Sequence, residues 1–401
     1  MCSHSSTAAT ALPTRHVVRE LLRSRILEAV TVVIEEELNE QLGVDRYGRS
    51  EERRGYRNGR LRRTITTESG PMELSLPRAR VRDEAGSTHE FRSTIVPRYG
   101  RRTRRVDEAI LGIYLAGANT RRIRKALLPL LGEAHLSKSA ISRVVSRLKA
   151  LFAGWSGRDL SDERYPVLIL DAIHLKVRLV RRVVSVPALV VLGVDESGTK
   201  RLVALRLAVS EAATNWGAVI DDLSARHLQS PGLIISDGHK GLRRAIAAWP
   251  EARVQRCTLH KRSNLEAQCP AHARGELRRD YAAIVHAESA AAARSAHVAF
   301  LTKWRSLCPP VARSLEEAGH QLLTFYDFPR PMWKSLRTTN AIENLNREFR
   351  RRTKTQASFS TEDAAITLLY GLIAFEQIKM RRIDGHQHVA RLVMPNCRHA
   401  A

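Results

Sequence analysis

The sequence lacks a long hydrophobic run. Its longest nearly apolar stretch, Val183–Val194, falls well short of the roughly 20 residues that a membrane-spanning helix needs. No positively charged leader followed by an apolar segment opens the chain. We therefore expect neither a membrane span nor a secretory leader.

Cysteine is scarce as well. There are five cysteines, an odd number, and no two of them form a CxxC pair. Disulfide frameworks and paired zinc knuckles are therefore not indicated, and a reducing cytosolic compartment is the simplest interpretation. The five residues are Cys2, Cys257, Cys269, Cys308 and Cys397.

Acidic residues are few relative to basic ones. The 66 Lys and Arg residues outnumber the 41 Asp and Glu residues, which gives a net charge of +25 and a pI near 10.8. Such an excess indicates a polyanionic partner, namely DNA, RNA or a membrane surface, and the short apolar runs disfavour the membrane. We expect a cytoplasmic, nucleoid-associated protein. Aromatic residues make up only 5%, but a hydrophobic content of 43% over 401 residues is enough for two or three globular domains.

Residues 1–45 contain a strong amphipathic pattern. Apolar residues recur at helical spacing from Arg15 to Leu42, with acids and bases between them. The pattern fits a helix that pairs subunits as well as a helix that packs within its own domain. Oligomerisation through this segment is thus one of two open interpretations.

Residues 46–105 form a basic region. From Asp45 to Arg105 there are 17 arginines, eight acids and no lysine. Within it, Arg62–Pro77 alternates apolar and polar residues around Gly70 and Pro71, which predicts a small β-hairpin with its turn at these two residues. Arginines beside a hairpin suit contact with a DNA backbone, whereas a solvated, partly disordered basic linker is the alternative.

Three short helices are predicted in residues 106–154. They cover Val106–Ala116, Thr120–Leu131 and Ser137–Phe152, separated by short turns. This spacing is typical of a helix-turn-helix DNA-binding domain, although any three-helix bundle shares it. The third helix carries the basic side chains expected of a groove-reading helix, including Lys138, Arg143 and Arg147.

From residue 160 onward the pattern changes to strands. The predicted order is β-β-β-α-β-α-β over residues 160–261, which is the order of a ribonuclease-H-like core. The segments are strands 165–178, 182–195 and 200–210, helix 212–226, strand 232–237, helix 240–249 and strand 253–257. Residues 262–337 are then predicted to form a helical insertion with alanine-rich helices over Glu276–Ala299. Residues 338–384 are predicted to form the last helices of the core, and residues 385–401 a tail. The last helices are predicted over Asn340–Arg352 and Thr361–Arg382.

The fold class expected from these segments is an α/β ribonuclease-H-like catalytic core with a helical insertion. A mainly α-helical DNA-binding region with a small β-hairpin precedes it.

Three acids stand out in this arrangement. Asp171 lies inside an apolar strand, where an ionised carboxylate is costly unless it is paired, hydrogen-bonded or bound to a metal. Asp237 ends the fourth strand, which neighbours the first in such a core, and Glu343 opens the helix after the insertion. Taken singly, Asp237 also fits a turn, and Asn340 with Glu343 fits a capping box.

The three acids together predict a metal site. Carboxylates a few Å apart repel one another, so divalent cations between them stabilise the arrangement. Ligation by oxygen alone suits Mg²⁺ or Mn²⁺. Two such ions roughly 4 Å apart would activate an attacking hydroxyl and stabilise the leaving oxygen in an in-line phosphodiester displacement.

Several motifs together resemble the Mutator-like family of bacterial insertion-sequence transposases, over most of the chain. The motifs are Ser50–Gly59 (SEERRGYRNG), Arg105–Ile110 (RVDEAI), Leu170–Arg178 (LDAIHLKVR), Ser236–Leu242 (SDGHKGL), Gln255–Lys261 (QRCTLHK) and Thr338–Arg352 (TTNAIENLNREFRRR). The resemblance implies that Asp171, Asp237 and Glu343 are the catalytic and metal-binding DDE triad, split by a helical insertion. It further implies metal-dependent DNA strand cleavage and strand transfer at terminal inverted repeats, and action as a homodimer or larger synaptic complex on double-stranded DNA.

Other residues of these motifs are candidates for supporting roles. Cys257 and His260 match the C-x2-H pair of the family, for which we prefer a role in supporting the active site over zinc binding, the alternative. Predicted DNA contacts in the core are Lys176, Lys240, Lys261, Arg347 and Arg350, and an ordinary solvated helix face is the alternative for the two arginines.

Two rival functions share these features. Another ribonuclease-H-like nuclease would cleave DNA without joining it. A transposase-derived DNA-binding regulator would bind DNA without catalysis, but the complete acid triad argues against it.

Overall fold

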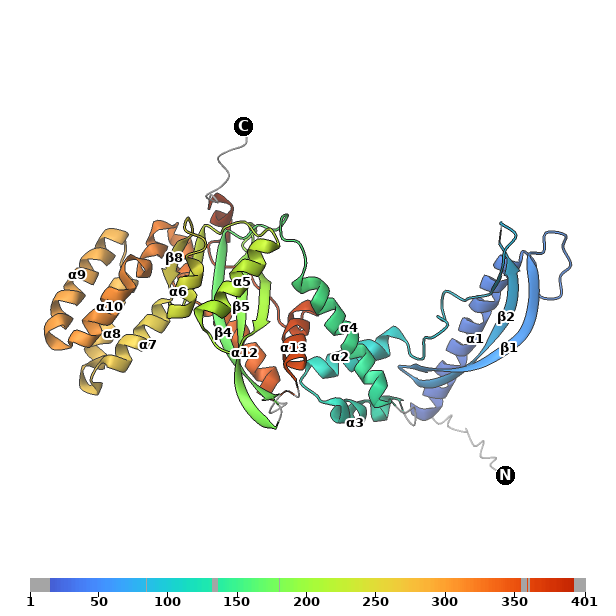
Figure 1. Ribbon diagram of the computed structural model, residues 1–401. Coiled ribbons are helices and arrows are strands. Elements are labelled where there is room, and N and C mark those ends of the chain that lie inside the picture. Colours follow the sequence, from blue (N-terminus) through green and yellow to red (C-terminus); the bar gives the residue numbers. More distant parts are fainter. Residues whose placement is uncertain are drawn as a thin grey trace, which may run out of the picture. The chain divides into compact units, whose positions relative to one another are not determined.

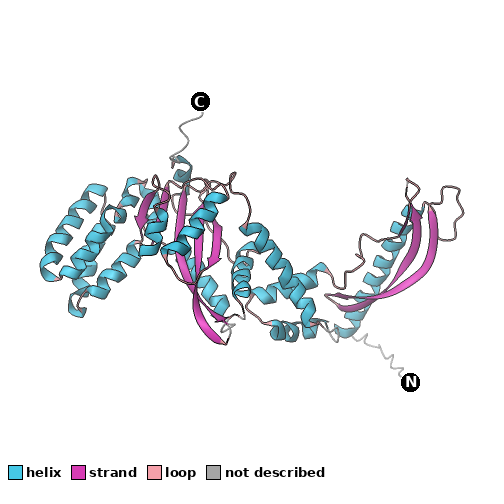
Figure 2. Ribbon diagram, in the orientation of Figure 1, coloured by secondary structure: helices cyan, strands magenta, loops and turns pink. Residues whose placement is uncertain are grey.

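The structure of the protein is a computed structural model that describes residues 15–83, 85–131, 136–179, 181–354, 359 and 361–392 (Figure 1, Figure 2). The chain separates into two compact units. The first comprises the described residues up to Tyr114 together with Ala118–Val145, and the second comprises Leu115–Gly117 and the described residues from Ser146 onward. The predicted turn at residues 132–135, the end of the predicted tail (393–401) and the first 14 residues lie outside the described chain.

A helix packed on a small sheet opens the first unit. The helix is α1 (Arg15–Leu42), and the antiparallel sheet has the order β1-β2-β3, with β1 at Gly55–Thr67, β2 at Gly70–Arg82 and β3 at Thr88–Glu90. Ile34, Leu38 and Leu42 of α1 are buried against apolar residues of β1 and β2. The predicted hairpin is therefore confirmed, and the basic region is not a disordered linker.

The hairpin turn differs from the predicted one. Glu68 and Ser69 form the turn, Thr67 pairs with Gly70, and Pro71 lies within β2 opposite Thr66. Gly70 has a φ of 109°, which favours glycine, and Pro71 is tolerated because it lies next to the start of the strand. The Gly-Pro signal marked the end of the turn rather than its centre.

Three helices follow in the predicted places. They are α2 (Arg104–Leu115), α3 (Thr120–Leu131) and α4 (Lys138–Ser156), and their apolar faces share one buried cluster. The Ser137 hydroxyl accepts a hydrogen bond from the amide of Ala140 and so caps the start of α4.

The second unit is built on a five-stranded mixed sheet of order β6-β5-β4-β7-β8. The strands β4, β5 and β6 pair antiparallel, whereas β4 with β7 and β7 with β8 pair parallel. The elements are β4 (Val167–Leu179), β5 (Arg182–Val194), β6 (Lys200–Leu207), α5 (Ala213–Ala225), β7 (Leu233–Ser236), α6 (Lys240–Ile246) and β8 (Arg253–Arg256). The predicted element order is confirmed, because period-2 and period-3.6 patterns are strong in this segment.

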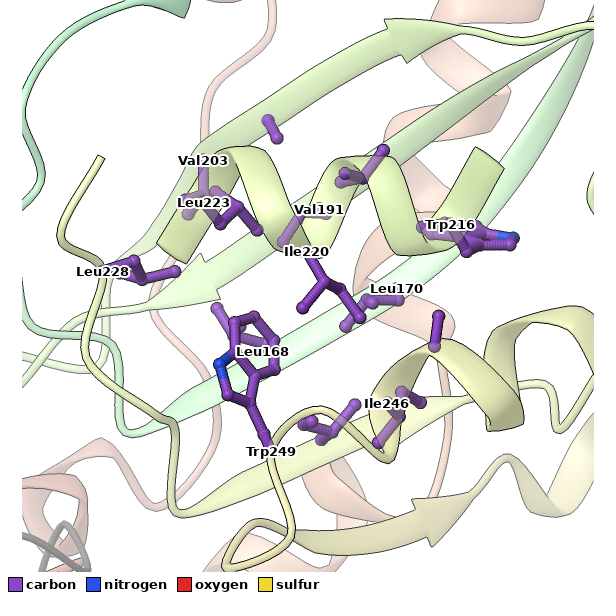
Figure 3. Close-up of a cluster of buried hydrophobic side chains, with 14 of the residues drawn as sticks. Leu168, Leu170, Val191, Val203, Trp216, Ile220, Leu223, Leu228, Ile246 and Trp249 are labelled. Atoms are coloured by element: carbon purple, nitrogen blue, oxygen red, sulfur yellow. The ribbon is translucent and has the colours of Figure 1, made fainter. Parts of the chain in front are cut away.

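One face of this sheet packs against α5 and α6 through a large apolar cluster (Figure 3). Leu168 and Leu170 of β4 contribute to it together with Trp216 and Ile220 of α5 and Ile246 of α6. Successive strand residues point to opposite faces, so Asp171 belongs to the other face. That face meets α12 (Asn340–Thr353) and α13 (Glu362–Ala374).

The insertion between β8 and α12 is helical, as predicted. The alanine-rich segment over Glu276–Ala299 belongs to two helices, because the first ends before His286 and the Ser289 hydroxyl caps the second by accepting a hydrogen bond from the Ala292 amide. The helices are α7 (Thr258–Gln268), α8 (Arg274–Val285), α9 (Ala290–Leu307), α10 (Pro309–Ala318) and α11 (Trp333–Leu336). Short 3-10 segments cover Ala271–Ala273, Gly319–Leu322, Thr324–Asp327, Arg330–Met332 and, after α13, His386–Arg391.

The last long helix is shorter than predicted. α13 begins with Thr361 as its cap and ends at Ala374 instead of Arg382, because Glu376 adopts a left-handed φ of 53° that reverses the chain. Within the described part of the chain, no helix combines the length and apolarity that a bilayer crossing requires.

Candidate active site

Two of the three predicted acids lie where the parallel pairing of β4 and β7 ends. The parallel ladder between these strands runs from the pair Val167 and Leu233 to the pair Leu170 and Ser236. Asp171 is the next residue of β4, which continues to Leu179, and Asp237 is the first residue after β7. Neighbouring parallel strands lie about 4.8 Å apart, so the two acids start from neighbouring positions.

Asp237 occupies a tight turn between β7 and α6. Its Oδ1 accepts a hydrogen bond of 2.9 Å from the backbone amide of His239, and Gly238 has a φ of 82°. A β-carbon at Gly238 would lie 2.2 Å from Nε of the buried Arg256, so only glycine fits between this turn and the guanidinium. The turn interpretation of Asp237 is correct, and the same turn presents its carboxylate at the end of β7.

Glu343 lies in the first turns of α12. The helix begins with Thr339 as N-cap, and no side chain caps it, so the capping box between Asn340 and Glu343 does not form. Instead, the Thr339 hydroxyl lies 2.9 Å from Glu343 Oε1 and 3.2 Å from Cys257 Sγ. A hydroxyl has one proton, which it donates to one of these acceptors at a time.

Asn346 connects α12 to β4. Its Nδ2 donates a hydrogen bond of 2.9 Å to Asp171 Oδ2, and the side chain is only 2% exposed. It follows Glu343 by three residues, so both side chains project from the same side of the helix. Sequence reasoning missed this residue. The available signal was a polar side chain on the otherwise apolar face of Ile342, Leu345 and Phe349.

The other two acids act electrostatically on Asp171. The pKa of Asp171 is raised to about 6, chiefly by burial and to a smaller extent by the negative charges of Asp237 and Glu343, against the opposing effects of the Ala172 amide and of His260. The Asp171 carboxylate therefore lacks compensating positive charge in this environment. A cation bound between the acids would supply it.

Cys257 and His260 lie beside Glu343. Cys257 is fully buried at the N-terminus of α7, and its sulfur accepts a hydrogen bond from the Thr339 backbone amide at 3.4 Å. Burial alone would raise the pKa of Cys257, but hydrogen bonds from His260 and Thr339 hold it below its usual value. The hydrogen bond to Cys257 raises the pKa of His260 to about 9, with smaller contributions from the charges of Asp171 and Glu343.

Glu343 adds a carboxylate to the thiol of Cys257 and the imidazole of His260 as a possible metal ligand. Ligand atoms of Cys257, His260 and Glu343 all lie within 4.8 Å of one another, and among the described residues this is the group of three or more donors with that spacing. His260 Nδ1 is 3.8 Å from Glu343 Oε1. The sequence had shown only two ligands, Cys257 and His260, because Glu343 follows them by more than 80 residues.

Four of the five predicted DNA contacts of the core are exposed. Lys240 begins α6 next to the Asp237 turn, and the other three, Lys176, Arg347 and Arg350, extend from β4 and α12. Arg347 also donates a hydrogen bond to Asn344.

Lys261 is the exception, because it is 2% exposed and its ammonium lies 3.0 Å from Glu317 and 3.3 Å from Ser314. It shares Glu317 with the equally buried Arg256. In this structure Lys261 is therefore an internal ion-pair partner and does not reach the surface that DNA would touch.

The predicted groove-reading side chains lie on α4. Lys138, Arg143 and Arg147 are all exposed there.

Comparison with known proteins gives one consistent family. A profile described as "Transposase, Mutator family" matches residues 2–379. The transposase for insertion sequence element IS406 of Burkholderia multivorans is 34% identical over 358 residues, covering 88% of this chain and 89% of the relative. The IS905 transposase of Lactococcus lactis is 32% identical, with 86% of each chain covered, and the IS1081 transposase of Mycobacterium tuberculosis is 31% identical, with 95% of this chain and 90% of the relative covered.

Proposed function

The chain belongs to the Mutator family of transposases, and from this premise we propose that Asp171, Asp237 and Glu343 form the catalytic triad of a DDE transposase. The proposed reaction is metal-dependent DNA cleavage and strand transfer at the terminal inverted repeats of an insertion sequence. The observation that carries the proposal is that three acids from three separate segments come close enough for the charges of Asp237 and Glu343 to contribute, after burial, to the raised pKa of Asp171.

The proposed fold of the catalytic unit is ribonuclease-H-like. Three antiparallel strands followed by two parallel ones, in the order β6-β5-β4-β7-β8, support it, as do the helices α5 and α6 that connect the parallel strands. The insertion from α7 to α11 precedes the helix that carries Glu343.

The residues present fit divalent Mg²⁺ or Mn²⁺. The donors are carboxylate oxygens, which these hard cations prefer, and the electrostatic environment of Asp171 calls for positive charge. Two bound ions, held by Asp171, Asp237 and Glu343, would supply activation of the attacking oxygen and stabilisation of the leaving oxygen.

The chemistry itself needs no covalent bond between protein and DNA. Water attacks a phosphodiester at the end of the element, and the bond from phosphorus to the 3′ oxygen breaks, which leaves a 3′-OH and a 5′-phosphate. The 3′-OH then attacks a phosphodiester of another strand, so one phosphodiester bond forms as another breaks. Asn346 fixes the Asp171 carboxylate in this scheme, and Thr339 holds that of Glu343.

We assign Cys257 and His260 a supporting role. Their contacts with Thr339 and Glu343 orient the first turn of α12. Zinc binding by Cys257, His260 and Glu343 remains the competing interpretation, and stoichiometric zinc in protein purified without added metal would favour it over ours.

The DNA-binding and assembly regions are proposed from charge and exposure. We assign α2, α3 and α4 to recognition of the terminal repeats through Lys138, Arg143 and Arg147 in a groove. Lys176, Lys240, Arg347 and Arg350 would contact the strand being cleaved. We assign α1 to self-association in a homodimer or larger synaptic complex.

Strand cleavage by purified protein tests the triad. Asp237→Ala is expected to lower the rate of cleavage of terminal-repeat DNA by about 10²-fold or more, because a ligand of the cations that would stabilise the transition state is lost, while DNA affinity stays near that of the wild type. Asp221→Ala, which removes an exposed carboxylate from α5, is the matched control and should cleave normally. Unchanged cleavage by Asp237→Ala would refute the site.

The same assay separates the rival functions. A transposase joins the exposed 3′-OH to a second DNA, whereas a plain nuclease releases cut DNA without joined product. DNA binding without metal-dependent cleavage or joining by the wild type would favour the regulator.

A further inference from the structure

An arginine-lined cavity lies in the first unit, and the three acids belong to the second. Its volume is about 580 Å³. Five of its seven lining residues are arginines, and none is an acid. The lining residues are Arg62, Arg63, Thr64, Arg98, Tyr99, Arg101 and Arg143.

Three segments that are distant in sequence build the cavity. β1 contributes Arg62, Arg63 and Thr64, the loop after β3 contributes residues 98–101, and α4 contributes Arg143. The sequence had assigned the basic hairpin and the third helix to separate domains. Their arginines instead line one hollow.

Backbone hydrogen bonds hold the loop beside the strand. The Thr66 amide donates to the Arg101 carbonyl at 2.9 Å, and the Thr103 amide donates to the Thr66 carbonyl at 2.9 Å. Arg63 donates to the carbonyl of Gly100 from the other side. The cavity wall is therefore preorganised, and little order has to be gained on binding.

The charges of this cavity are only weakly compensated. Arg62 has an 85% exposed side chain and approaches Glu73 no closer than 3.8 Å. Arg98 is likewise 3.8 Å from Glu90, a carboxylate that Arg78 approaches to 3.1 Å. Exposed ion pairs at such distances contribute little, so the arginines keep most of their capacity for an external anion.

Tyr99 gives the cavity a second kind of contact. Its ring is 84% exposed, with the Arg98 guanidinium 5.7 Å from the ring centroid. An exposed phenol next to arginines can donate a hydrogen bond to a phosphate oxygen or lie against a sugar. Arginine forks and a hydroxyl together match the phosphodiester backbone.

We propose that this cavity, which we call the arginine cleft, binds the sugar-phosphate backbone of the same DNA duplex whose groove α4 enters. The β1 hairpin and α4 then act as one DNA-binding surface, with the cleft holding the backbone that flanks the groove. This inference deepens the proposed function and rests on DNA being the substrate.

Salt-dependent binding of the full-length protein to a labelled duplex tests the cleft. The triple variant Arg62→Gln, Arg98→Gln, Arg101→Gln should weaken binding about tenfold or more near 150 mM salt, because each lost phosphate contact also removes counterion release. The slope of log affinity against log salt should fall by about 1 for each arginine lost, to a similar extent for terminal-repeat and unrelated sequences.

A matched triple controls for total charge. Arg46→Gln, Arg49→Gln, Arg82→Gln removes three exposed arginines of the same unit that do not line the cleft. Its salt slope should change far less than that of the cleft triple. Equal losses by both triples, or wild-type affinity of the cleft triple, would overturn the proposal.

Two further measurements keep the test decisive. The single variant Arg62→Gln removes only an exposed side chain, so it preserves the fold and should lower the slope by about 1 even where the triple misfolds. Tighter binding of single-stranded RNA than of duplex DNA, lost in the cleft triple, would assign the cleft to RNA and refute the duplex.

Catalysis separates this inference from the proposed function. At protein concentrations that saturate the DNA, the cleft triple should still cleave it in a metal-dependent reaction. Absence of cleavage in the wild type as well would refute the triad and leave the cleft standing.

Discussion

Asn346 shows how one buried amide can fix the position of a carboxylate on a neighbouring strand. Its Nδ2 is bound to Asp171, and its Oδ1 is buried and lacks a hydrogen-bond partner within the described part of the chain. Burying an amide oxygen without a partner costs about 1–3 kcal/mol. Because Asn346 carries this cost on the apolar face of α12, we infer that its role is to position the Asp171 carboxylate.

We predict that Asn346→Ala lowers the apparent affinity for metal in the cleavage reaction by about 10-fold to 100-fold, as removal of groups that orient metal ligands generally does. The lost hydrogen bond frees the Asp171 carboxylate to rotate, so higher Mg²⁺ concentrations should restore part of the rate. A titration of initial cleavage rate against Mg²⁺ concentration measures this shift.

The control for this variant lies two residues away. Asn344→Ala changes an exposed amide on the same helix and should leave the metal titration unchanged. A loss in Asn346→Ala that no metal concentration improves, together with a lowered melting temperature, would indicate a purely structural role.

At the scale of elements, α1 stands out because one side of it is buried and the other is exposed and apolar. Ile34, Leu38 and Leu42 enter the core of the first unit. The exposed apolar side chains of the helix are Val17, Val18, Leu21, Leu22, Ile26, Val32 and Val33. A stripe of this kind on a 28-residue helix marks an interaction surface.

The charges of α1 favour a second copy as the partner. Residues 15–27 carry four arginines and one glutamate, whereas residues 28–42 carry five glutamates and neither lysine nor arginine. Antiparallel pairing of two α1 helices sets the basic half of each against the acidic half of the other. This satisfies the self-complementarity that a twofold interface requires.

Leu22→Glu is therefore expected to raise the dissociation constant of the dimer by about 10²-fold or more, since two leucines per dimer each lose roughly 1.5–3 kcal/mol of burial. Sedimentation equilibrium measures the change. Val209→Glu, which alters an apolar residue that is 95% exposed outside α1, is the control. A monomeric wild type, or a Leu22→Glu variant as dimeric as the control, would rule out pairing through α1.

On the scale of the whole molecule, the two proposed activities depend on different chemistry. We propose that DNA binding uses arginines and lysines of the first unit and α4, and that cleavage uses the acids of the second unit. The proposed site between Asp171, Asp237 and Glu343 requires metal cations, which basic side chains cannot replace. Arginine contacts with phosphate need no metal.

Chelation with EDTA should therefore abolish cleavage and joining while duplex affinity changes by less than about threefold, because binding uses the basic residues alone. Cleavage of labelled terminal-repeat DNA and fluorescence anisotropy of the same duplex measure the two quantities. Readdition of Mg²⁺ or Mn²⁺ should restore the reaction. Cleavage that persists in EDTA would contradict a metal-dependent site.

Local patterns in the sequence determined much of this protein. The periodicities placed the elements of the core in their observed order, and the apolar run around Asp171 and the positions of Asp237 and Glu343 marked the three acids. These signals depend only on residues within about one helix or strand of each other in the sequence, so they can be recognised without knowing the fold. The same limit explains the errors at Pro71 and at the end of the helix predicted over Thr361–Arg382, where a turn outweighed the local pattern.

The tertiary structure alone decided which distant residues meet. It joined Asn346 to Asp171, set Glu343 beside Cys257 and His260, buried Lys261 against Glu317, and brought Arg143 into one cleft with the hairpin. Each of these contacts depends on strand register and helix packing, which fix the distance between residues that the chain itself leaves far apart. The net charge of the sequence counts a buried lysine such as Lys261 and an exposed arginine equally. Only the packing around each side chain determines which of them can contact DNA.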